Sequence, residues 1–309
     1  MNLLLAIVAG GKRLRPGTKL NYGFAVREWL AFAGEVPDGW SPYRVEKFYL
    51  ALRRKMTTAS ANNVIAGVRY ASRRYASVHG GVDFAAAIET ERPEERAPPV
   101  ALSRADIHRL LQACRGTAPA DLRDRALVIL GVTTGLRRDG LAGIAFGDFK
   151  LARGFDYQTA EVTLKGGRRF AVPLLDGALA AILPWRKWLA SQEITSGRFF
   201  RSVSLPTIQG PRTIGKAISN DGVYKCLSRR ARAANVTGYH PHAMRHAFVT
   251  FCRSAGVPLH EIAAITGHQI EGSGVIDRVY SDQATIGASA LRSIAPVFAE
   301  FFATAAAGS

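Results

Sequence analysis

Residues 242–246 read His242-Ala243-Met244-Arg245-His246, and this stretch gives the first indication of the fold and its chemistry. Its three polar residues are spaced i, i+3 and i+4, so a helix would place two imidazoles and a guanidinium on one face. The planar guanidinium matches two non-bridging oxygens of a phosphodiester, and an imidazole can move a proton near neutral pH. The same face would also suit side chains that cap or bridge polar groups in a core, so the stretch alone leaves both interpretations open.

Residues able to take part in the same chemistry lie on both sides of this stretch. In chain order they are Thr134-Gly135-Leu136-Arg137, Lys165, Gly267-His268 and Tyr280. Residues 155–174 alternate in polarity and turn at Gly166-Gly167, which predicts a β-hairpin with Lys165 on the strand entering the turn. Helices are predicted around 176–190, 221–234, 242–255 and 258–266.

In this order the motifs resemble those of the tyrosine recombinase (phage integrase) superfamily, which includes Cre-type and Xer-type enzymes. The resemblance is close over residues 100–285 and loose over the rest of the chain. It implies an α-helical N-terminal DNA-binding domain of the core-binding type and a mixed, mainly α, C-terminal catalytic domain with a small β-sheet or hairpin.

The activity implied by the resemblance is site-specific DNA recombination. Such an enzyme cleaves and rejoins duplex DNA through a 3′-phosphotyrosine intermediate and a Holliday junction. One alternative is a hairpin-forming telomere resolvase, against which the modest chain length argues. Another is a catalytically silent DNA-binding protein on the same fold, against which the complete set of catalytic residue types argues.

The resemblance also assigns a role to each motif residue, the six being Arg137, Lys165, His242, Arg245, His268 and Tyr280. The two arginines would clamp the scissile phosphate, and His268 would donate a further hydrogen bond to it. His242 would help to deprotonate the tyrosine, which is a poor nucleophile as a neutral phenol, and the lysine would protonate the departing 5′ oxygen. Because the phosphotyrosine conserves the energy of the cleaved bond, no metal, nucleotide or other cofactor is implied.

Two features depart from the family pattern. An acidic residue usually stands three positions after the first arginine, but that position is Gly140 here, and Asp139 stands one earlier. Either Asp139 provides the acidic support or the support is missing, and a second alignment would make Arg138 the catalytic arginine. In addition, Tyr280 follows His268 by twelve residues, a longer spacing than usual.

Other tyrosines and histidines in the chain are expected to have less direct roles. Tyr157, Tyr224 and Tyr239 are predicted to pack or to contact DNA. His240 is predicted to be a loop histidine, and His246 a structural helix histidine.

The N-terminal third predicts a helical domain. Apolar residues recur at helical spacing around 22–33, 45–52 and 61–68. Residues 89–99 combine three prolines with dense charge, which predicts a linker between a DNA-binding domain at 1–98 and a catalytic domain at 99–309. Ser103, followed by Asp106, predicts the start of the next helix.

The charge balance predicts an anionic partner. Lysine and arginine total 41 against 24 acidic residues, a net charge of +17. Candidate DNA-contact residues are Arg69, Arg73 and Arg74 in the third helix and a stripe formed by Lys225, Arg229 and Arg232, although either set could also be a solvated face. The implied partner is double-stranded DNA with inverted-repeat recombination sites, and the resemblance leaves open whether accessory proteins take part.

The C-terminal segment is too apolar for a free tail. Residues of about 285–303 would either fold back on their own domain or form an oligomerisation helix that docks on a neighbour, giving a homotetramer on DNA. The three cysteines are far apart in sequence, and no apolar run is expected to approach the roughly 20 residues of a membrane span. These features predict a cytoplasmic, nucleoid-associated protein with no membrane contact.

Overall fold

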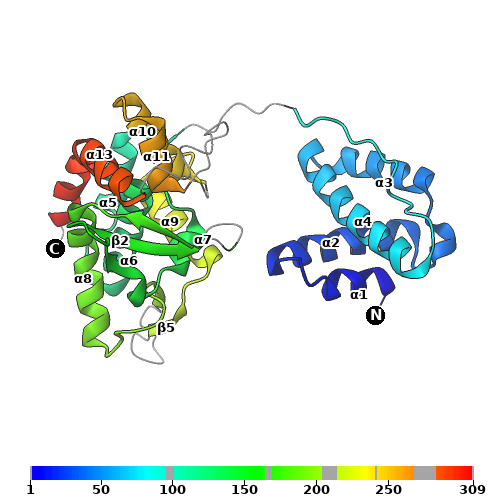
Figure 1. Ribbon diagram of the computed structural model, residues 1–309, viewed down its shortest axis with the longest axis horizontal. Coiled ribbons are helices and arrows are strands. Elements are labelled where there is room, and N and C mark those ends of the chain that lie inside the picture. The colour runs from blue at the N-terminus through cyan, green and yellow to red at the C-terminus, as the bar shows by residue number, and fades with distance from the viewer. Residues whose placement is uncertain are drawn as a thin grey trace. The chain divides into compact units, whose positions relative to one another are not determined.

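The computed structural model describes residues 2–94, 101–163, 167, 169–203, 214–240, 242–267 and 283–307. The chain divides into two compact units, Met1–Ala97 and Pro98–Ser309, and each has its own hydrophobic core (Figure 1). Three residues with predicted catalytic roles, Lys165, His268 and Tyr280, lie outside the described residues.

The first unit is helical. Its elements are α1 (Leu3–Gly10), α2 (Pro16–Ala33), the 3-10 turn η1 (Pro37–Gly39), α3 (Pro42–Lys55) and α4 (Thr58–His79). The α4 helix packs against the other three, and Trp29 of α2 forms the centre of the core, in edge contact with Phe48 and stacked on Phe84. The predicted helices around 22–33, 45–52 and 61–68 therefore form, and each is longer than its apolar pattern.

The first part of the predicted linker packs on this unit. The backbone N–H of Glu91 donates to the Tyr49 hydroxyl over 2.9 Å, and the side chain of Asn62 donates to the Glu91 carbonyl over 2.9 Å. Arg53 forms an ion pair of 2.9 Å with the Glu91 carboxylate. The linker at residues 89–99 stays a prediction, and within it Glu91 is bound to the first unit by polar side chains of α3 and α4.

The second unit is mainly helical with two small antiparallel sheets. Its helices are α5 (Arg104–Gln112), α6 (Pro119–Thr134), α7 (Arg138–Gly143), the 3-10 turn η2 (Phe146–Asp148), α8 (Asp176–Ser191), α9 (Asn220–Ala233), α10 (Ala243–Ser254), α11 (Leu259–Thr266) and α13 (Gln283–Ala306). Its strands are β1 (Phe149–Leu151), β2 (Gln158–Thr163), β3 (Arg169–Pro173), β4 (Arg201–Val203) and β5 (Ile214–Ala217), in the orders β1-β2-β3 and β4-β5.

The centre of this unit is α6, which lies among the other helices in Figure 1. Almost every residue of α6 is buried, and the helix packs against α5, α7, α8, α9, α10 and α13. This central position explains its nearly continuous apolar run, since a helix covered on all sides has no solvent face to make polar.

Two local predictions are confirmed in the second unit. The Ser103 side chain accepts from the backbone of Asp106, and the Asp106 side chain accepts from the backbone of Ser103, which completes a capping box at the start of α5. The β2 and β3 strands pair from Thr159 opposite Pro173 to Thr163 opposite Arg169, as the alternation within 155–174 predicted.

Candidate active site

The candidate site begins at the turn that ends α6. Gly135 adopts a left-handed conformation with φ of 59°, and a β-carbon there would lie 2.9 Å from the Phe248 ring. Both the backbone angle and the lack of space therefore require glycine. After this turn the chain continues to Arg137, the residue immediately before α7. The Arg137 side chain is half-buried and forms no hydrogen bond or ion pair among the described residues.

The second part of the site lies at the start of α10. His242 is the residue immediately before that helix and is exposed, whereas the Arg245 side chain is buried. The Arg245 guanidinium donates to the carbonyl of Gly135 over 2.8 Å and to the carbonyl of Thr266 over 3.2 and 3.3 Å. Arg245 thus ties the end of α6 to the end of α11, and its own orientation is fixed by both.

Arg137, His242 and Arg245 form one cationic cluster. Burial and the nearby Arg137 charge lower the pKa of Arg245 to about 10. Partial desolvation of the imidazole, followed by the Arg137 charge, also lowers the pKa of His242 below its ordinary value, although the residue as a whole is exposed. Two guanidiniums held beside a neutral imidazole form a site suited to an anion, because a bound phosphate would relieve their mutual repulsion.

Arg138, the alternative catalytic arginine, points elsewhere. Its guanidinium forms an ion pair with Asp221 of α9 at 3.4 Å and lies over the Tyr224 ring at 6.0 Å from the centroid. It also contributes to the lowered pKa of His242, but it is the last of the named causes. The geometry therefore favours Arg137 as the member of the cluster.

Asp139 lies near the cluster in spite of its exposed side chain. Its charge acts on Arg245 and opposes the lowering of that residue's pKa. A β-carbon at Gly140, where the family usually has an acid, would lie 3.2 Å from the Leu136 side chain. An acidic side chain at 140 would require Leu136 to move, and Asp139 supplies a negative charge without that change.

The α9 helix carries the predicted basic stripe on an exposed surface. Lys225, Arg229 and Arg232 are all exposed, and Arg229 lies 3.7 Å from the fully buried Asp124 of α6. Arg230 donates to the same carboxylate over 2.8 Å. Burial opposes the charge on Arg230, but the hydrogen bond and charge of Asp124 outweigh it and raise the pKa of Arg230.

Asp124 was missed from the sequence, although it fixes α9 to α6. It also accepts two hydrogen bonds from Arg123, at 2.9 and 2.6 Å. A buried charge needs such pairing, since an isolated one would be strongly destabilising. The available signal was the charged triplet Arg123-Asp124-Arg125 within an otherwise apolar helix.

The basic residues of α4 in the first unit differ in how exposed their side chains are. Arg69 is half-buried and its guanidinium donates to the carbonyl of Ile88, so it has a structural role. Arg73 is 77% exposed in its side chain and lies 3.9 Å from Asp83, and Arg74 is exposed. Arg73 and Arg74 therefore present the accessible charge, whereas the guanidinium of Arg69 is engaged within the unit.

The tyrosines predicted to be non-catalytic occupy packed environments. Tyr224 and Tyr239 stack with ring centroids 6.1 Å apart, and burial raises the pKa of Tyr239, which disfavours a nucleophilic phenolate. The Tyr157 hydroxyl lies against Gly287 of α13. His240 and His246 are in edge contact at 5.2 Å, in agreement with a loop and a helix histidine.

The C-terminal helix α13 packs on its own unit. Phe298 and Phe301 are fully buried, and Phe298 stacks on Phe248 of α10 with centroids 5.5 Å apart. At its far end Glu300 binds Arg104 and lies 3.1 Å from His108 of α5. The apolar face that suggested docking on a neighbour is thus covered within one chain, so it no longer requires a second protomer.

Residues 285–306 of α13 are nevertheless long and apolar enough to cross a membrane by composition, with a mean hydropathy of 1.3. The expectation that no run approaches that length is therefore wrong. The apolar character of α13 is explained by packing within the unit, because Ile294, Phe298 and Phe301 fill the core between α5, α6 and α10.

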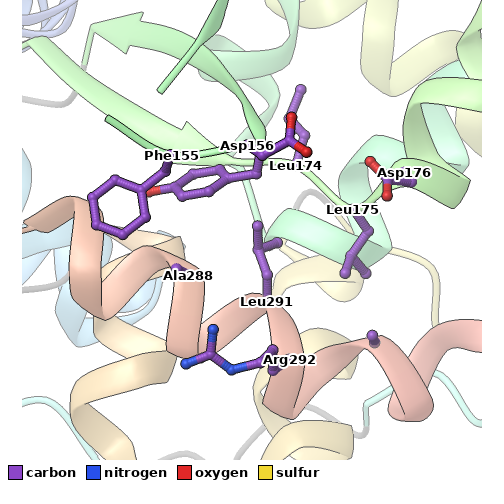
Figure 2. A pocket seen from close by; sticks show the side chains of 10 residues that line it. Phe155, Asp156, Leu174, Leu175, Asp176, Ala288, Leu291 and Arg292 are labelled. Atoms are coloured by element: carbon purple, nitrogen blue, oxygen red, sulfur yellow. The ribbon is translucent and has the colours of Figure 1, made fainter. Parts of the chain in front are cut away.

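A pocket lies where α13 crosses the sheet. Figure 2 shows Phe155 and Asp156 on one side of it and Leu291 and Arg292 of α13 on the other. The volume is about 380 Å³. None of the cluster residues Arg137, His242 and Arg245 lines it, so it is separate from the candidate site.

Comparison with known proteins shows which family the chain resembles. The model of the phage integrase family matches residues 101–276. Tyrosine recombinase XerD of Bifidobacterium longum is 27% identical over 263 residues, which cover 78% of either chain. Tyrosine recombinase XerA of Thermococcus kodakarensis is 27% identical over 255 residues, covering 82% of this chain and 81% of the relative.

Solved structures share the fold at lower identity. The XerH recombinase in its pre-cleavage complex with difH has a TM-score of 0.63 and 15% identity, and the match covers 92% of this chain and 80% of that one. A lambda integrase dimer on a COC′ core site has a TM-score of 0.61 and 17% identity, covering 89% and 97%. The predicted fold class is confirmed by these matches.

Together, the fold, the matched family and the arginine-histidine cluster define a tyrosine-type site-specific DNA recombinase. The chain belongs to the phage integrase family, whose model spans more than half of its length.

Proposed function

We propose that the chain cleaves and rejoins a specific DNA site through Tyr280, with Arg137 and Arg245 as the phosphate clamp. The observation that carries this proposal is the cationic cluster at the ends of α6, α10 and α11. Attack by the phenol oxygen on phosphorus forms a 3′-phosphotyrosine and releases the 5′ oxygen. The two guanidiniums offset the charge that develops on the non-bridging oxygens in the transition state.

The proton transfers are assigned to three other residues. His242, whose pKa is lowered, is neutral at pH 7 and can accept the phenol proton. Lys165 donates a proton to the leaving 5′ oxygen, and His268 donates a hydrogen bond to the phosphate. Asp139 supports the clamp through its charge, in place of the acid that Gly140 lacks.

The proposed DNA contacts come from both units. Lys225, Arg229 and Arg232 of α9 would contact phosphates or base edges, and Arg73 and Arg74 would add contacts from α4. Arg69 would contribute mainly by ordering the chain after α4. The salt dependence of binding would then follow the number of phosphates that these side chains neutralise.

The proposed assembly is a tetramer on two sites, each with inverted repeats. A lambda integrase tetramer on a Holliday junction has a TM-score of 0.60 with this chain. We propose that this chain also acts as a tetramer, with two successive strand exchanges through a Holliday junction on nucleoid DNA. Oligomerisation through α13 stays a prediction, and it would require that helix to leave the site it occupies on its own unit or to use its exposed face.

The test is a covalent-adduct assay on a nicked duplex built from a site with inverted repeats, sought in the DNA that flanks the gene. The nick lets the cleaved strand diffuse away, so adducts accumulate. Wild-type protein should form an adduct that survives denaturation, and Tyr280→Phe should bind the duplex equally well without forming it. Binding without any adduct in the wild type would instead indicate the catalytically silent alternative.

A further inference from the structure

Glu261 of α11 is a buried carboxylate outside the catalytic set. The residue is 5% exposed, and its Oε1 accepts a hydrogen bond of 2.6 Å from the Ser289 hydroxyl of α13. Its Oε2 is buried and has no hydrogen-bond partner among the residues that the structure describes. No ion pair involves Glu261 within the described part of the chain. Burying a carboxylate with only one hydrogen bond costs free energy of folding, so the bond to Ser289 is the main polar contact that stabilises this side chain.

This bond joins the two helices that bracket the nucleophile. The α11 helix ends at Thr266, two residues before His268, and α13 begins at Gln283, three residues after Tyr280. The two helices also pack along each other. The Glu261–Ser289 bond therefore links the first turn of α11 to the second turn of α13, the two helices on either side of residues 268–282.

Both helices are also fixed to the rest of the catalytic unit near these ends. The Thr266 carbonyl accepts from Arg245 of the phosphate clamp at 3.2 Å. At Gly287 of α13 a β-carbon would lie 2.6 Å from the Tyr157 hydroxyl, so the helix approaches the β-sheet region closely there. The bond to Ser289 adds a specific polar contact to the packing of α13 along α11.

We propose that Glu261 is a positioning residue for the nucleophile, acting through Ser289. By fixing the register of α13 on α11, it would set the separation of Gly267 and Gln283, the described residues on either side of the stretch that contains His268 and Tyr280. This inference rests on the proposed function, because it assumes that Tyr280 attacks the phosphate. A displacement of about 1 Å at a reacting atom can cost on the order of 100-fold in rate, so a single buried bond at this place can matter for catalysis.

Three substitutions in the full-length chain separate this role from simple packing. Glu261→Met keeps a similar volume without an acceptor, Glu261→Gln keeps an acceptor without the charge, and Ser289→Ala removes the donor. Ser293→Ala is the matched control, because Ser293 lies one turn further along α13 and forms no hydrogen bond among the described residues. The measurements are half-site affinity, melting temperature and the single-turnover rate of adduct formation at saturating protein.

We expect Glu261→Met and Ser289→Ala to slow adduct formation by about 10- to 100-fold with half-site affinity unchanged. Glu261→Gln should retain a rate close to that of the wild type, and Ser293→Ala should equal the wild type. Because the two residues act as one unit, the double variant should be no slower than Glu261→Met alone. A wild-type rate in Glu261→Met would overturn the inference, as would an equal loss of affinity, melting temperature and rate in all three variants.

A substrate with a 5′-bridging sulfur gives a second readout, since a thiolate leaves without needing a proton. It should restore the rate of Lys165→Ala, whose defect concerns the leaving group, and should leave Glu261→Met slow, since its defect concerns the nucleophile. Restoration of both variants would contradict the positioning role. If the wild type formed no adduct with either substrate, the proposed function would fail instead, which keeps the two failures distinct.

Discussion

The Arg245 guanidinium donates a hydrogen bond of 2.8 Å to the carbonyl oxygen of Gly135, a residue 110 positions earlier in the chain. The bond holds the start of α10 against the turn that carries Arg137. Because Gly135 needs its left-handed angle and lacks room for a side chain, the turn is rigid where Arg245 binds it. The Arg245 guanidinium and the backbone that carries Arg137 are therefore held together before DNA binds, and such preorganisation is how electrostatic catalysis lowers a barrier.

Arg137 and Arg138 should differ in their effect on cleavage. Arg137→Ala should reduce the single-turnover cleavage rate by about 100-fold or more, the typical cost of losing one preorganised transition-state donor. Arg138→Ala should cost less, because its guanidinium is engaged by Asp221 and Tyr224. A larger loss in Arg138→Ala would mean that the second alignment is right.

The role of Asp139 can be tested in the same cleavage assay. If Asp139 supports Arg245 through its charge, Asp139→Asn should also slow cleavage, by less than Arg137→Ala does. An Asp139→Asn variant with the wild-type rate would show that the clamp works without acidic support.

The pKa of His242 should respond to the neighbouring arginine. Arg137→Gln removes a positive charge beside the imidazole, so the His242 pKa should rise toward its ordinary value of about 6.5. Ring-proton NMR across pH 4.5 to 8, with His242→Gln to assign the signal, measures this shift. Arg138→Gln is the control and should raise the pKa less, because its charge is the weaker cause.

The same pKa governs the acid limb of the cleavage rate. Since the folded pKa lies below the ordinary value, neutral His242 predominates at pH 7 and remains so as the pH falls to about 6.5. Adduct formation by the wild type should therefore decline only at still lower pH. A decline that begins above pH 7 would argue against His242 as the proton acceptor.

Lys165 should act on the leaving group. Lys165→Ala should slow cleavage of ordinary DNA by about 100- to 10,000-fold, the range of general acid catalysis, and should cleave the 5′-bridging sulfur substrate at nearly the wild-type rate. Comparing the single-turnover rates on both substrates checks this. An equal defect on the two substrates would mean that Lys165 orients the DNA and another group supplies the proton.

Phe298 should contribute strongly to the stability of the isolated chain. Phe298→Ala should cost about 3–5 kcal/mol of unfolding free energy, because the ring is fully buried and stacks on Phe248. Ala299→Ser, on the exposed face of α13, should change stability little. Urea unfolding of both variants measures the difference. If Phe298→Ala were as stable as the wild type and lost only assembly on DNA, docking of α13 on a neighbour would be supported.

Much of the fold could be predicted because its signals are local. The capping box at Ser103, the hairpin alternation and the helical spacing around 176–190 and 242–255 each depend on residues a few positions apart. The full length of α4, from residue 58 to residue 79, was harder to predict from the apolar pattern, because its second half carries arginines.

The features that could not be predicted depend on contacts between distant segments. Nothing near Glu91 indicated that Tyr49 and Asn62 would bind it. Nothing near Glu261 indicated that Ser289 would donate to it. The six catalytic residues were predicted from their order in the chain and stay a prediction, whereas the cluster of Arg137, His242 and Arg245 depends on the close approach of α6, α10 and α11.

The most direct test of the account is to identify the residue that becomes attached to DNA. Wild-type protein trapped on the nicked duplex can be digested with nuclease and trypsin, and the peptide that retains a nucleotide can be sequenced by mass spectrometry. The account predicts a single modified peptide, with the 3′-phosphate linked to the Tyr280 oxygen, and no such peptide from Tyr280→Phe. A nucleotide attached to Tyr224, Tyr239 or any other residue would contradict it.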